Sequence, residues 1–423
     1  SISTSGYMSG GFSNGDIIGV ELDLDNGTIE FYKNGTGYGN AFTGLTGSFL
    51  VAAESRTSSG INDHRTNFGA TAWDYTPSTG FAGINTEYNG TASNVTYQEA
   101  TNFSPDLVIV KSRNTGEPFM WRDSVRGGNA TRLFSDRTAI SSVFTPDSIS
   151  SFDSNGFTCG GNGGRINSSS NNYAAWCFNA GEDAPATNND GTISSTVKAN
   201  PEAGFSIVTF TSSNSTASPP PMNYMGHGLD AAPEMVIYKR LDATQHWVVQ
   251  HDGVTTNGGL HLDLTNAQSG PFTYDFFDNT TTTIGVRSNY AISRNGSYIA
   301  YNFHSVDGYQ KIGSYTGTGA SGNIIETGFE PAFIMIKRTD STSSWYILDN
   351  KRIGSNGYAN SLYANLTNVE ETTQDSNGYY PINFLSNGFE ILQVSNGYNA
   401  SGGTYIYLAI AADPDTTTPT VEN

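Results

Sequence analysis

The chain has 423 residues, a net charge of −19 and only 20 Lys and Arg, which argues against binding nucleic acid, since that affinity comes mostly from basic side chains. Only 14% of the residues are charged, whereas Gly, Asn, Ser and Thr abound, so solubility must come from neutral polar groups. No run of 18 apolar residues occurs, and the first residues, SISTSGYMSGG, lack the regions of a signal peptide, so we expect no membrane insertion.

Short runs rich in Val, Ile, Tyr, Phe and Thr recur between Gly, Asn and Ser turns, which predicts an all-β protein. The first such element is GVELDLDNGTIEFYKNG, residues 19–35, where apolar and acidic residues alternate up to Asn26 and Gly27. This pattern predicts a β-hairpin whose tight turn places both Asn26 and Gly27 at positive φ. A calcium loop is the alternative, but the acidic residues do not have the required spacing from Gly27.

Three later segments share a pattern in which a Pro opens an apolar run that ends on a Lys, and a Trp follows after a turn. The Pro-to-Lys runs are Pro105 to Lys111, Pro233 to Lys239 and Pro331 to Lys337, and the tryptophans are Trp121, Trp247 and Trp345. Recurrence at one repeat position predicts that each Trp fills the core of its own domain. The alternative is that these indoles are platforms for sugars.

A second shared block closes each repeat: NNYAAWCFNAG from 171, GSYIAYNFHSVDG from 296 and GTYIYLAIAADP from 403. Shared blocks separated by loops of different length are typical of repeated domains. After an N-terminal domain at 1–88, the chain is therefore predicted to hold three β-rich repeats and two connecting or terminal segments. The repeats span 89–184, 204–307 and 308–415, with a linker at 185–203 and a C-terminal tail at 416–423.

The repeat register also suggests the state of the two cysteines. Cys159 corresponds to Ile391 of the third repeat and Cys177 to Ala409, which predicts that both thiols are buried in the core. The alternative is a disulfide between adjacent strands, which depends on the two thiols facing each other.

The densest candidate for a metal site is QHWVVQHDGVTTNGGLHLD, which carries His246, His251, Asp252 and His261. Positions 246 and 251 differ by an odd number, so on one strand their imidazoles point to opposite faces unless a bulge intervenes. We therefore interpret these histidines as turn and surface residues, and we expect no metal, no cofactor and no catalytic residues.

Aromatic residues in Gly- and Asn-rich loops outside the repeat register are better candidates for contacting carbohydrate. An aromatic face buries the C–H groups of a sugar while neighbouring Asn and Asp bind its hydroxyls. The candidates, all in the third repeat, are Tyr358, Tyr363, Tyr379, Tyr380 and Tyr398. The alternative is that these tyrosines decorate strand edges or a subunit interface.

The first 88 residues, with NGDIIGVELDLDNGTIEFYKNGTGYGNAFTGL and TNFGATAWDYTPSTGFAGINTE, resemble the C-terminal half of a SPRY domain of bacteriophage structural proteins. The resemblance implies a β-sandwich that binds partners through loops and whose first strands are missing here, through cleavage or because a preceding segment supplies them. From about 89 to 415, motifs such as DSVRGG, WCFNAG, GHGLDAAPEMVIYK and TGFEPAF are similar to a repeat region that follows SPRY in proteins of marine tailed phages. That region offers no catalytic motif to carry over.

The resemblance implies a virion protein of a tailed phage, located in a tail fibre, spike or similar appendage and built as an elongated string of jelly-roll or SPRY-like β-sandwiches. We expect it to adhere to host-surface glycan or to hold neighbouring virion subunits, without chemistry. The fibre analogy implies a homo-oligomer such as a trimer. Two other functions stay open: a capsid decoration or tail scaffold protein that contacts only virion subunits, and a glycan-degrading enzyme with an acidic cleft.

Overall fold

The structure is a computed structural model, and the chain divides into two compact units, residues 1–93 and 94–423. Every helix or strand element in the described part of the chain is a strand, which confirms the all-β prediction. No helix there is long and apolar enough to cross a membrane. The structure describes residues 16–23, 26–44, 56–57, 60–61, 96–99, 103–127, 131–139, 142–143, 149–160, 165–169, 171–254, 258–270, 277–288, 292–353, 359–371 and 381–411.

The N-terminal unit contains a three-stranded antiparallel sheet, β1 (Ile18–Asp23), β2 (Thr28–Lys33) and β3 (Thr36–Phe42), and a short pair, β4 (Arg56–Thr57) and β5 (Gly60–Ile61). The pairing of β1 with β2 confirms the predicted hairpin. Its turn differs from the prediction, because Asp23 pairs with Thr28, whereas a two-residue turn at Asn26-Gly27 would pair residue 25 with Thr28. The two-residue turn with both residues at positive φ is Asn34-Gly35, between β2 and β3.

The C-terminal unit is built from three repeats, which we call the first (residues 96–178), second (186–303) and third (310–411). The first contains β6 (Thr96–Glu99), β7 (Leu107–Ser112), β8 (Met120–Asp123), β9 (Thr131–Phe134), β10 (Ser142–Val143), β11 (Ile149–Asp153), β12 (Gly156–Cys159) and β13 (Tyr173–Phe178). The second contains β14 (Ala186–Asn188), β15 (Ser195–Asn200), β16 (Phe205–Ser212), β17 (Met222–Gly226), β18 (Met235–Arg240), β19 (Val248–His251), β20 (Leu260–His261), β21 (Thr283–Arg287) and β22 (Gly296–Phe303). The third contains β23 (Gln310–Thr316), β24 (Asn323–Glu326), β25 (Pro331–Arg338), β26 (Trp345–Asp349), β27 (Leu362–Tyr363), β28 (Ile382–Leu385), β29 (Gly388–Ile391) and β30 (Thr404–Ala411).

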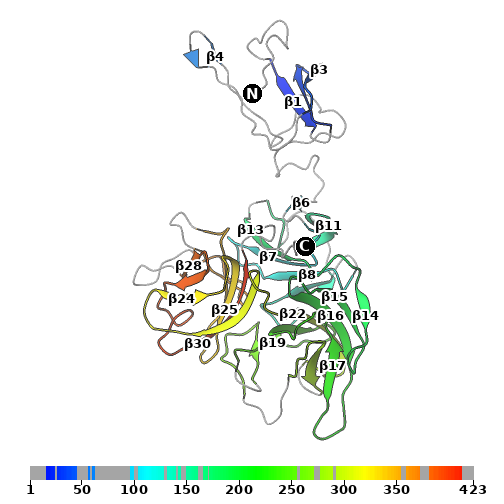
Figure 1. The fold of residues 1–423 in the computed structure, drawn as a ribbon, viewed down its shortest axis with the longest axis vertical. Helices are drawn as coiled ribbons and strands as arrows, with labels where there is room; N and C mark the ends of the chain where they lie inside the picture. The colour runs from blue at the N-terminus through cyan, green and yellow to red at the C-terminus, as the bar shows by residue number, and fades with distance from the viewer. Residues whose placement is uncertain are drawn as a thin grey trace. The chain divides into compact units, whose positions relative to one another are not determined.

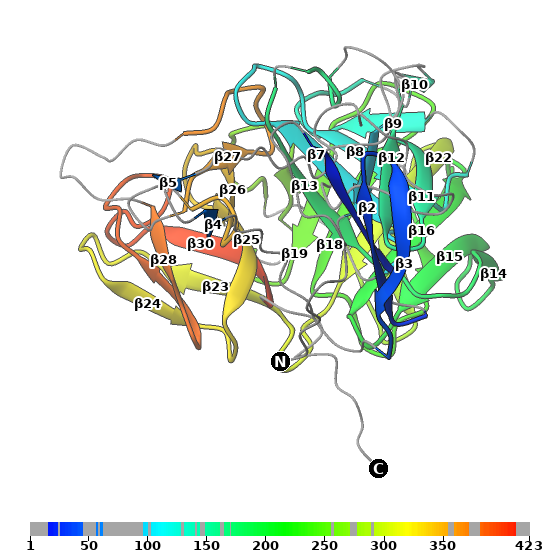
Figure 2. The ribbon, with the colours of Figure 1, turned by 90° about the horizontal axis from the view of Figure 1, so that it is seen from above.

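Each repeat has one main sheet and one small sheet of the same plan (Figure 1; Figure 2). The main sheets have the orders β10-β9-β8-β7-β13, β14-β15-β16-β22-β18-β19-β20 and β23-β30-β25-β26-β27, and the small sheets are β11-β12-β6, β17-β21 and β24-β29-β28. The Pro-to-Lys segments form β7, β18 and β25, and each pairs with the closing strand of its repeat. The predicted linker at 185–203 is wrong, because it contains β14 and β15, which extend the second main sheet.

The Pro-to-Lys strands are buried on both faces, which explains why their apolar residues run without a polar alternation. In β7, Leu107 and Ile109 face one hydrophobic cluster, whereas Val108 and Val110 face another beneath the small sheet. The strands β18 and β25 alternate between two clusters in the same way. Each repeat is therefore a β-sandwich whose main sheet also packs, through its second face, against the other repeats.

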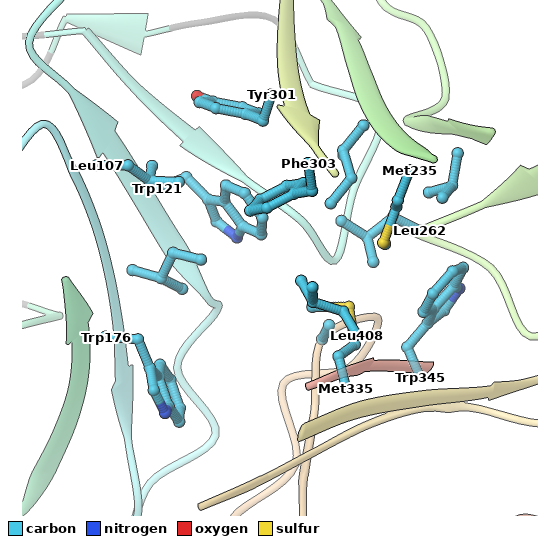
Figure 3. Close-up of a cluster of buried hydrophobic side chains, with 14 of the residues drawn as sticks. Leu107, Trp121, Trp176, Met235, Leu262, Tyr301, Phe303, Met335, Trp345 and Leu408 are labelled. Carbon is cyan, nitrogen blue, oxygen red and sulfur yellow. The ribbon is translucent and has the colours of Figure 1, made fainter. Parts of the chain in front are cut away.

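The cluster on this second face is one core shared by all three repeats. Figure 3 shows side chains from the first, second and third repeats converging there, among them Trp121, Tyr301 and Met335. Trp121, Trp247 and Trp345 all lie in this core and are at most 1% exposed, so none offers a ring face to a sugar. The expectation of a string of repeats, each with its own Trp-filled core, is therefore wrong for residues 94–423.

Hydrogen bonds join the repeats in one direction around this core. The indole Nε1–H of Trp247 in the second repeat donates to the carbonyl oxygen of Phe134 in the first, at 2.8 Å. The indole of Trp345 in the third repeat donates in the same way to His261 of the second, at 2.9 Å. The same type of contact thus joins the first repeat to the second and the second to the third. We call each boundary between two repeats a seam.

The first and third repeats close the ring through a third seam. The indole Nε1–H of Trp176 donates to Asp349 Oδ2 at 3.0 Å, and the Ser135 hydroxyl donates to the carbonyl oxygen of Ala364 at 2.7 Å. The repeats therefore form a closed ring with approximate three-fold symmetry.

Backbone hydrogen bonds within each repeat correct the predicted alignment of the tryptophans. In the second repeat the N–H of Leu262 donates to the carbonyl oxygen of Trp247, and in the third the N–H of Ala364 donates to that of Trp345. The equivalent bond of the first repeat runs from Ser135 to Phe119. Trp121 lies two residues further along, so its assignment to the same repeat position is wrong. Its Nε1 atom is buried and has no hydrogen-bond partner among the described residues.

Each Pro-to-Lys strand ends in a fully buried lysine, and we call Lys111, Lys239 and Lys337 the strand-end lysines. Their ammonium groups donate to backbone carbonyls, in two cases across a seam: Lys239 to Thr138 at 2.9 Å and Lys337 to Thr265 at 3.2 Å. Burial lowers the pKa of each from 10.5 to about 8. Lys239 and Lys337 therefore help to hold their seams, whereas Lys111 donates to Ser112 and Thr115 within the first repeat.

Candidate functional site

The structure describes two of the five predicted glycan-binding tyrosines, Tyr363 and Tyr398, and the rings of both lie next to that of Tyr346. Tyr358, Tyr379 and Tyr380 lie outside the described residues. Tyr363 is half-buried on β27, with its ring 5.3 Å from that of Tyr346.

Tyr398 is buried, with 2% of its surface exposed, inside the sandwich of the third repeat. Its hydroxyl lies 2.7 Å from Ser361 Oγ and its ring 4.3 Å from that of Tyr346. A ring enclosed in this way has no face left for a sugar, so the prediction of a glycan contact is wrong for Tyr398.

The structure brings His246 and His261 together and places His251 apart from them. His251 is buried, lies 3.3 Å from the carbonyl oxygen of Tyr407 in the third repeat, and has a pKa lowered by burial to about 4. His246 is partly exposed, and its Nδ1 lies 2.7 Å from Oδ2 of Asp263, a partner that sequence reasoning did not single out. The ring of His261 lies 5.0 Å from that of His246, tilted by 58°. Within the described residues, no three His, Cys, Asp or Glu side chains form a group that could hold a metal ion.

The two cysteines are free thiols in the sandwich of the first repeat, Cys159 buried and Cys177 half-buried. Burial raises the pKa of both thiols to about 12, so neither forms a reactive thiolate near neutral pH.

A concave site lies between the first and second repeats, and its origin is the sheet extension formed by β14 and β15. The described part of the first and third repeats has no counterpart of these two strands, so the extension carries the second main sheet beyond the shared core. Lys198 on β15 fixes the extension to the first repeat through an ion pair with Asp106 at 2.6 Å. Beside this ion pair, the face of the extended sheet that turns toward the first repeat is not covered by other strands.

The open side of the sheet carries a row of hydroxyl groups. Thr187, Thr196 and Thr209 are direct cross-strand partners on β14, β15 and β16, so their side chains share one face. Thr211 and Ser297 form the next pair on that face, with their hydroxyl oxygens 3.5 Å apart. β-branched threonines favour strands, and here they also supply polar groups to the surface.

These residues line a depression of about 810 Å³, which we call the hydroxyl-lined depression. Val125 and Arg126, from the corner after β8, form the wall contributed by the first repeat. Seven of the thirteen lining residues are Ser or Thr, and apolar contacts come from Val125, Ile193 and Leu241. The lining therefore combines hydroxyl groups with a similar share of apolar surface and carries almost no charge.

Arg126 is the one charged residue that lines the depression, and its charge is balanced. Its guanidinium lies 2.6 Å from Asp123 Oδ2, which also accepts a hydrogen bond from the Tyr301 hydroxyl at 3.1 Å. The carboxylate and the guanidinium are both buried, so they hold the corner after β8 in place. A buried pair of this kind fixes geometry and leaves little net charge for a ligand.

The fold and the site define an all-β protein in which three sandwich repeats close into a ring, with an open, hydroxyl-lined depression at one seam. The family described as Domain of unknown function (DUF7483) matches residues 76–414, most of the chain, and the protein belongs to this family. A SPRY domain matches residues 2–62, in agreement with the resemblance of the N-terminal region. No curated protein and no solved structure matches the chain.

Proposed function

We propose that this protein is a non-catalytic binding component of a tailed-phage virion, carried on a tail fibre, spike or similar appendage, and that it holds a neutral glycan of the host surface. The observation that carries the glycan proposal is the hydroxyl-lined depression, in which seven Ser and Thr residues surround a site with one neutralised charge. The phage assignment depends on the resemblance described above.

The chemistry of the depression suits an uncharged polyol. Each Ser or Thr hydroxyl both donates and accepts hydrogen bonds, so a row of them can pair with sugar hydroxyls in either sense. Val125, Ile193 and Leu241 can cover the C–H faces of the sugar. The volume lies within the range of ligand-binding pockets and fits a short oligosaccharide segment.

The lining favours binding over hydrolysis. Glycosidases use a pair of carboxyl groups that flank the scissile bond. None of the residues that line the depression is Asp or Glu, and the nearby carboxylate of Asp123 is already bonded to Arg126 and Tyr301. A sugar held here would meet hydrogen-bonding groups but no acid and base.

An array of neutral bacterial-surface glycans, applied to the full chain, tests the proposal with Thr209→Val and Thr211→Val. Each variant removes one hydroxyl while keeping the shape of the side chain, and should weaken binding about five-fold per lost hydrogen bond. Thr316→Val is the matched control, because Thr316 is exposed at the equivalent position of β23 in the third repeat. Unchanged binding in both test variants would refute the site.

The two other functions give different results in the same experiments. Release of new reducing ends from a bound glycan would indicate an enzyme. A chain that binds no glycan and that antibodies cannot reach on intact virions would indicate a scaffold or decoration protein.

A further inference from the structure

Three arginines surround one phenylalanine on the first repeat. The guanidinium carbons of Arg132, Arg137 and Arg165 lie 5.4, 4.9 and 5.3 Å from the ring centroid of Phe134. The chain has only 20 Lys and Arg in total and a net charge of −19, so such a concentration of positive charge is unusual for it. We call these four residues the arginine cluster.

The other two repeats show that the fold does not need these arginines. Phe134 is equivalent to His261 and Tyr363, because each lies directly after the Leu of its short strand and pairs with β8, β19 or β26. The position of Arg137 is held by Leu264 in the second repeat and by Leu366 in the third. Two repeats thus build the same strand end with an apolar side chain.

The nearby carboxylates do not use all of the donors of the cluster. Arg137 is paired with Asp136 through Nε and Nη2, at 3.2 and 2.8 Å. Arg165 lies 3.6 Å from Glu117, beyond hydrogen-bond distance, and makes no hydrogen bond within the described part of the chain. The side chains of Arg137 and Arg165 are 37% and 36% exposed, so solvent reaches both guanidinium groups.

We propose that the arginine cluster is a binding site for an oxyanion group, the carboxylate or sulfate of an acidic sugar. Guanidinium groups present paired N–H donors that match the two oxygens of such a group. The ring of Phe134 holds Arg137 and Arg165 against one surface, which limits the freedom that they lose on binding. Arg137 engages Asp136 through Nε and Nη2 alone, and Arg165 makes no hydrogen bond within the described residues, so both keep N–H donors for an added oxyanion.

The cluster and the hydroxyl-lined depression are built from different residues and suit different chemistry, so the proposal does not depend on the function proposed above. Binding to the cluster should weaken as salt is added, because the interaction is between charges. Binding of a neutral glycan in the depression should be insensitive to both salt and the loss of Arg137.

Isothermal titration of the full chain with oligogalacturonate, its methyl ester and inorganic sulfate tests the cluster. Arg137→Leu places in the first repeat the residue that the other two repeats already contain, and Arg165→Leu removes the second exposed guanidinium. Arg338→Leu is the matched control, since Arg338 also lies over a single ring, that of Tyr405, and pairs with one Asp. Thermal unfolding of each variant checks that it is folded.

The expected result is saturable binding of oligogalacturonate that is about ten-fold weaker in Arg137→Leu and in Arg165→Leu, and unchanged in Arg338→Leu. The methyl ester should bind much more weakly than the acid. Competition by inorganic sulfate would show that the oxyanion alone is recognised, whereas binding of the oligosaccharide without such competition would assign the site to the sugar-borne group. The proposal is overturned if neither anion binds, if the ester binds as well as the acid, or if Arg338→Leu is as weak as the two test variants.

Discussion

Replacing Trp247 by Phe should loosen the seam between the first and second repeats. The indole of Trp247 is fully buried, and its Nε1–H donates to the carbonyl oxygen of Phe134 at 2.8 Å. The first repeat carries Phe119 at the equivalent position, so a Phe ring is compatible with this part of the fold. The substitution therefore removes the inter-repeat hydrogen bond with little change in backbone structure.

The loss has two parts. Shrinking the ring costs about 1–2 kcal/mol of unfolding free energy in lost contacts and residual cavity. Losing the hydrogen bond and leaving the carbonyl oxygen of Phe134 unpaired costs about 1–3 kcal/mol more. We expect Trp247→Phe to lower the free energy of unfolding by about 2–5 kcal/mol.

Trp121→Phe is the matched control. Trp121 is equally buried, and its ring lies 5.3 Å from that of Trp247, but its Nε1 has no partner among the described residues. Here the substitution loses the same ring atoms and also removes an unpaired buried donor, which offsets part of the packing loss. Trp121→Phe should therefore be less destabilising than Trp247→Phe by about 2 kcal/mol.

Urea unfolding of the parent and both variants, followed by far-UV circular dichroism, measures their free energies of unfolding. The comparison is valid if the slope of free energy against urea concentration is the same in all three. If the two variants lose equal stability, the indole-to-carbonyl bond does not hold the seam, and the assignment of the three seams is wrong.

Three further predictions concern pH, backbone geometry and cooperativity. Because the folded pKa of the strand-end lysines is about 8, the unfolded chain binds more protons above that pH, so stability should rise from about pH 7.5 to 9. Stability should fall again above about pH 10, because thiols and tyrosines lose protons in the unfolded chain that the same groups keep when buried in the folded protein. In urea unfolding, Lys239→Met should show a smaller increase in stability between about pH 7.5 and 9 than the parent. Gly181→Ala should lower the free energy of unfolding by more than about 2 kcal/mol, because Gly181 has φ 101° and a Cβ there would lie 2.5 Å from the Ala199 carbonyl oxygen. Gly402→Ala is the control: Gly402 has φ 71° but lies in open space, so urea unfolding should show a loss of about 1 kcal/mol. Residues 94–423 should melt in one calorimetric transition, because the repeats share a core, and separate transitions for the repeats would contradict the ring.

Much of the strand structure of the repeats could be predicted from the sequence. The Pro-to-Lys runs form β7, β18 and β25, and the closing blocks form β13, β22 and β30, because each combines residues that favour strands with nearby turn residues. The linker prediction failed because turn-forming residues and strand-forming residues are mixed in this segment. Its Gly, Asn and Asp residues suggest a loop, but the alternating stretch around Val197 contributes β15 to a sheet.

The ring itself was not predicted, because a continuous apolar run shows that a strand is buried on both faces and does not show what covers it. A signal for the seams was nevertheless present. The segments LFSDRT from 133, LHLDLT from 260 and LYANLT from 362 repeat one pattern, and each lies at a seam.

The approximate symmetry of the ring separates what the fold requires from what function can add. Features present in all three repeats, such as the strand-end lysines, are explained by packing and by hydrogen bonds at the seams. Features present in one repeat have no such explanation, since the other two repeats fold without them. The β14–β15 extension occurs in the second repeat and the arginines around Phe134 in the first. Both proposed sites lie at departures from the symmetry, where substitutions are expected to change ligand binding more than stability.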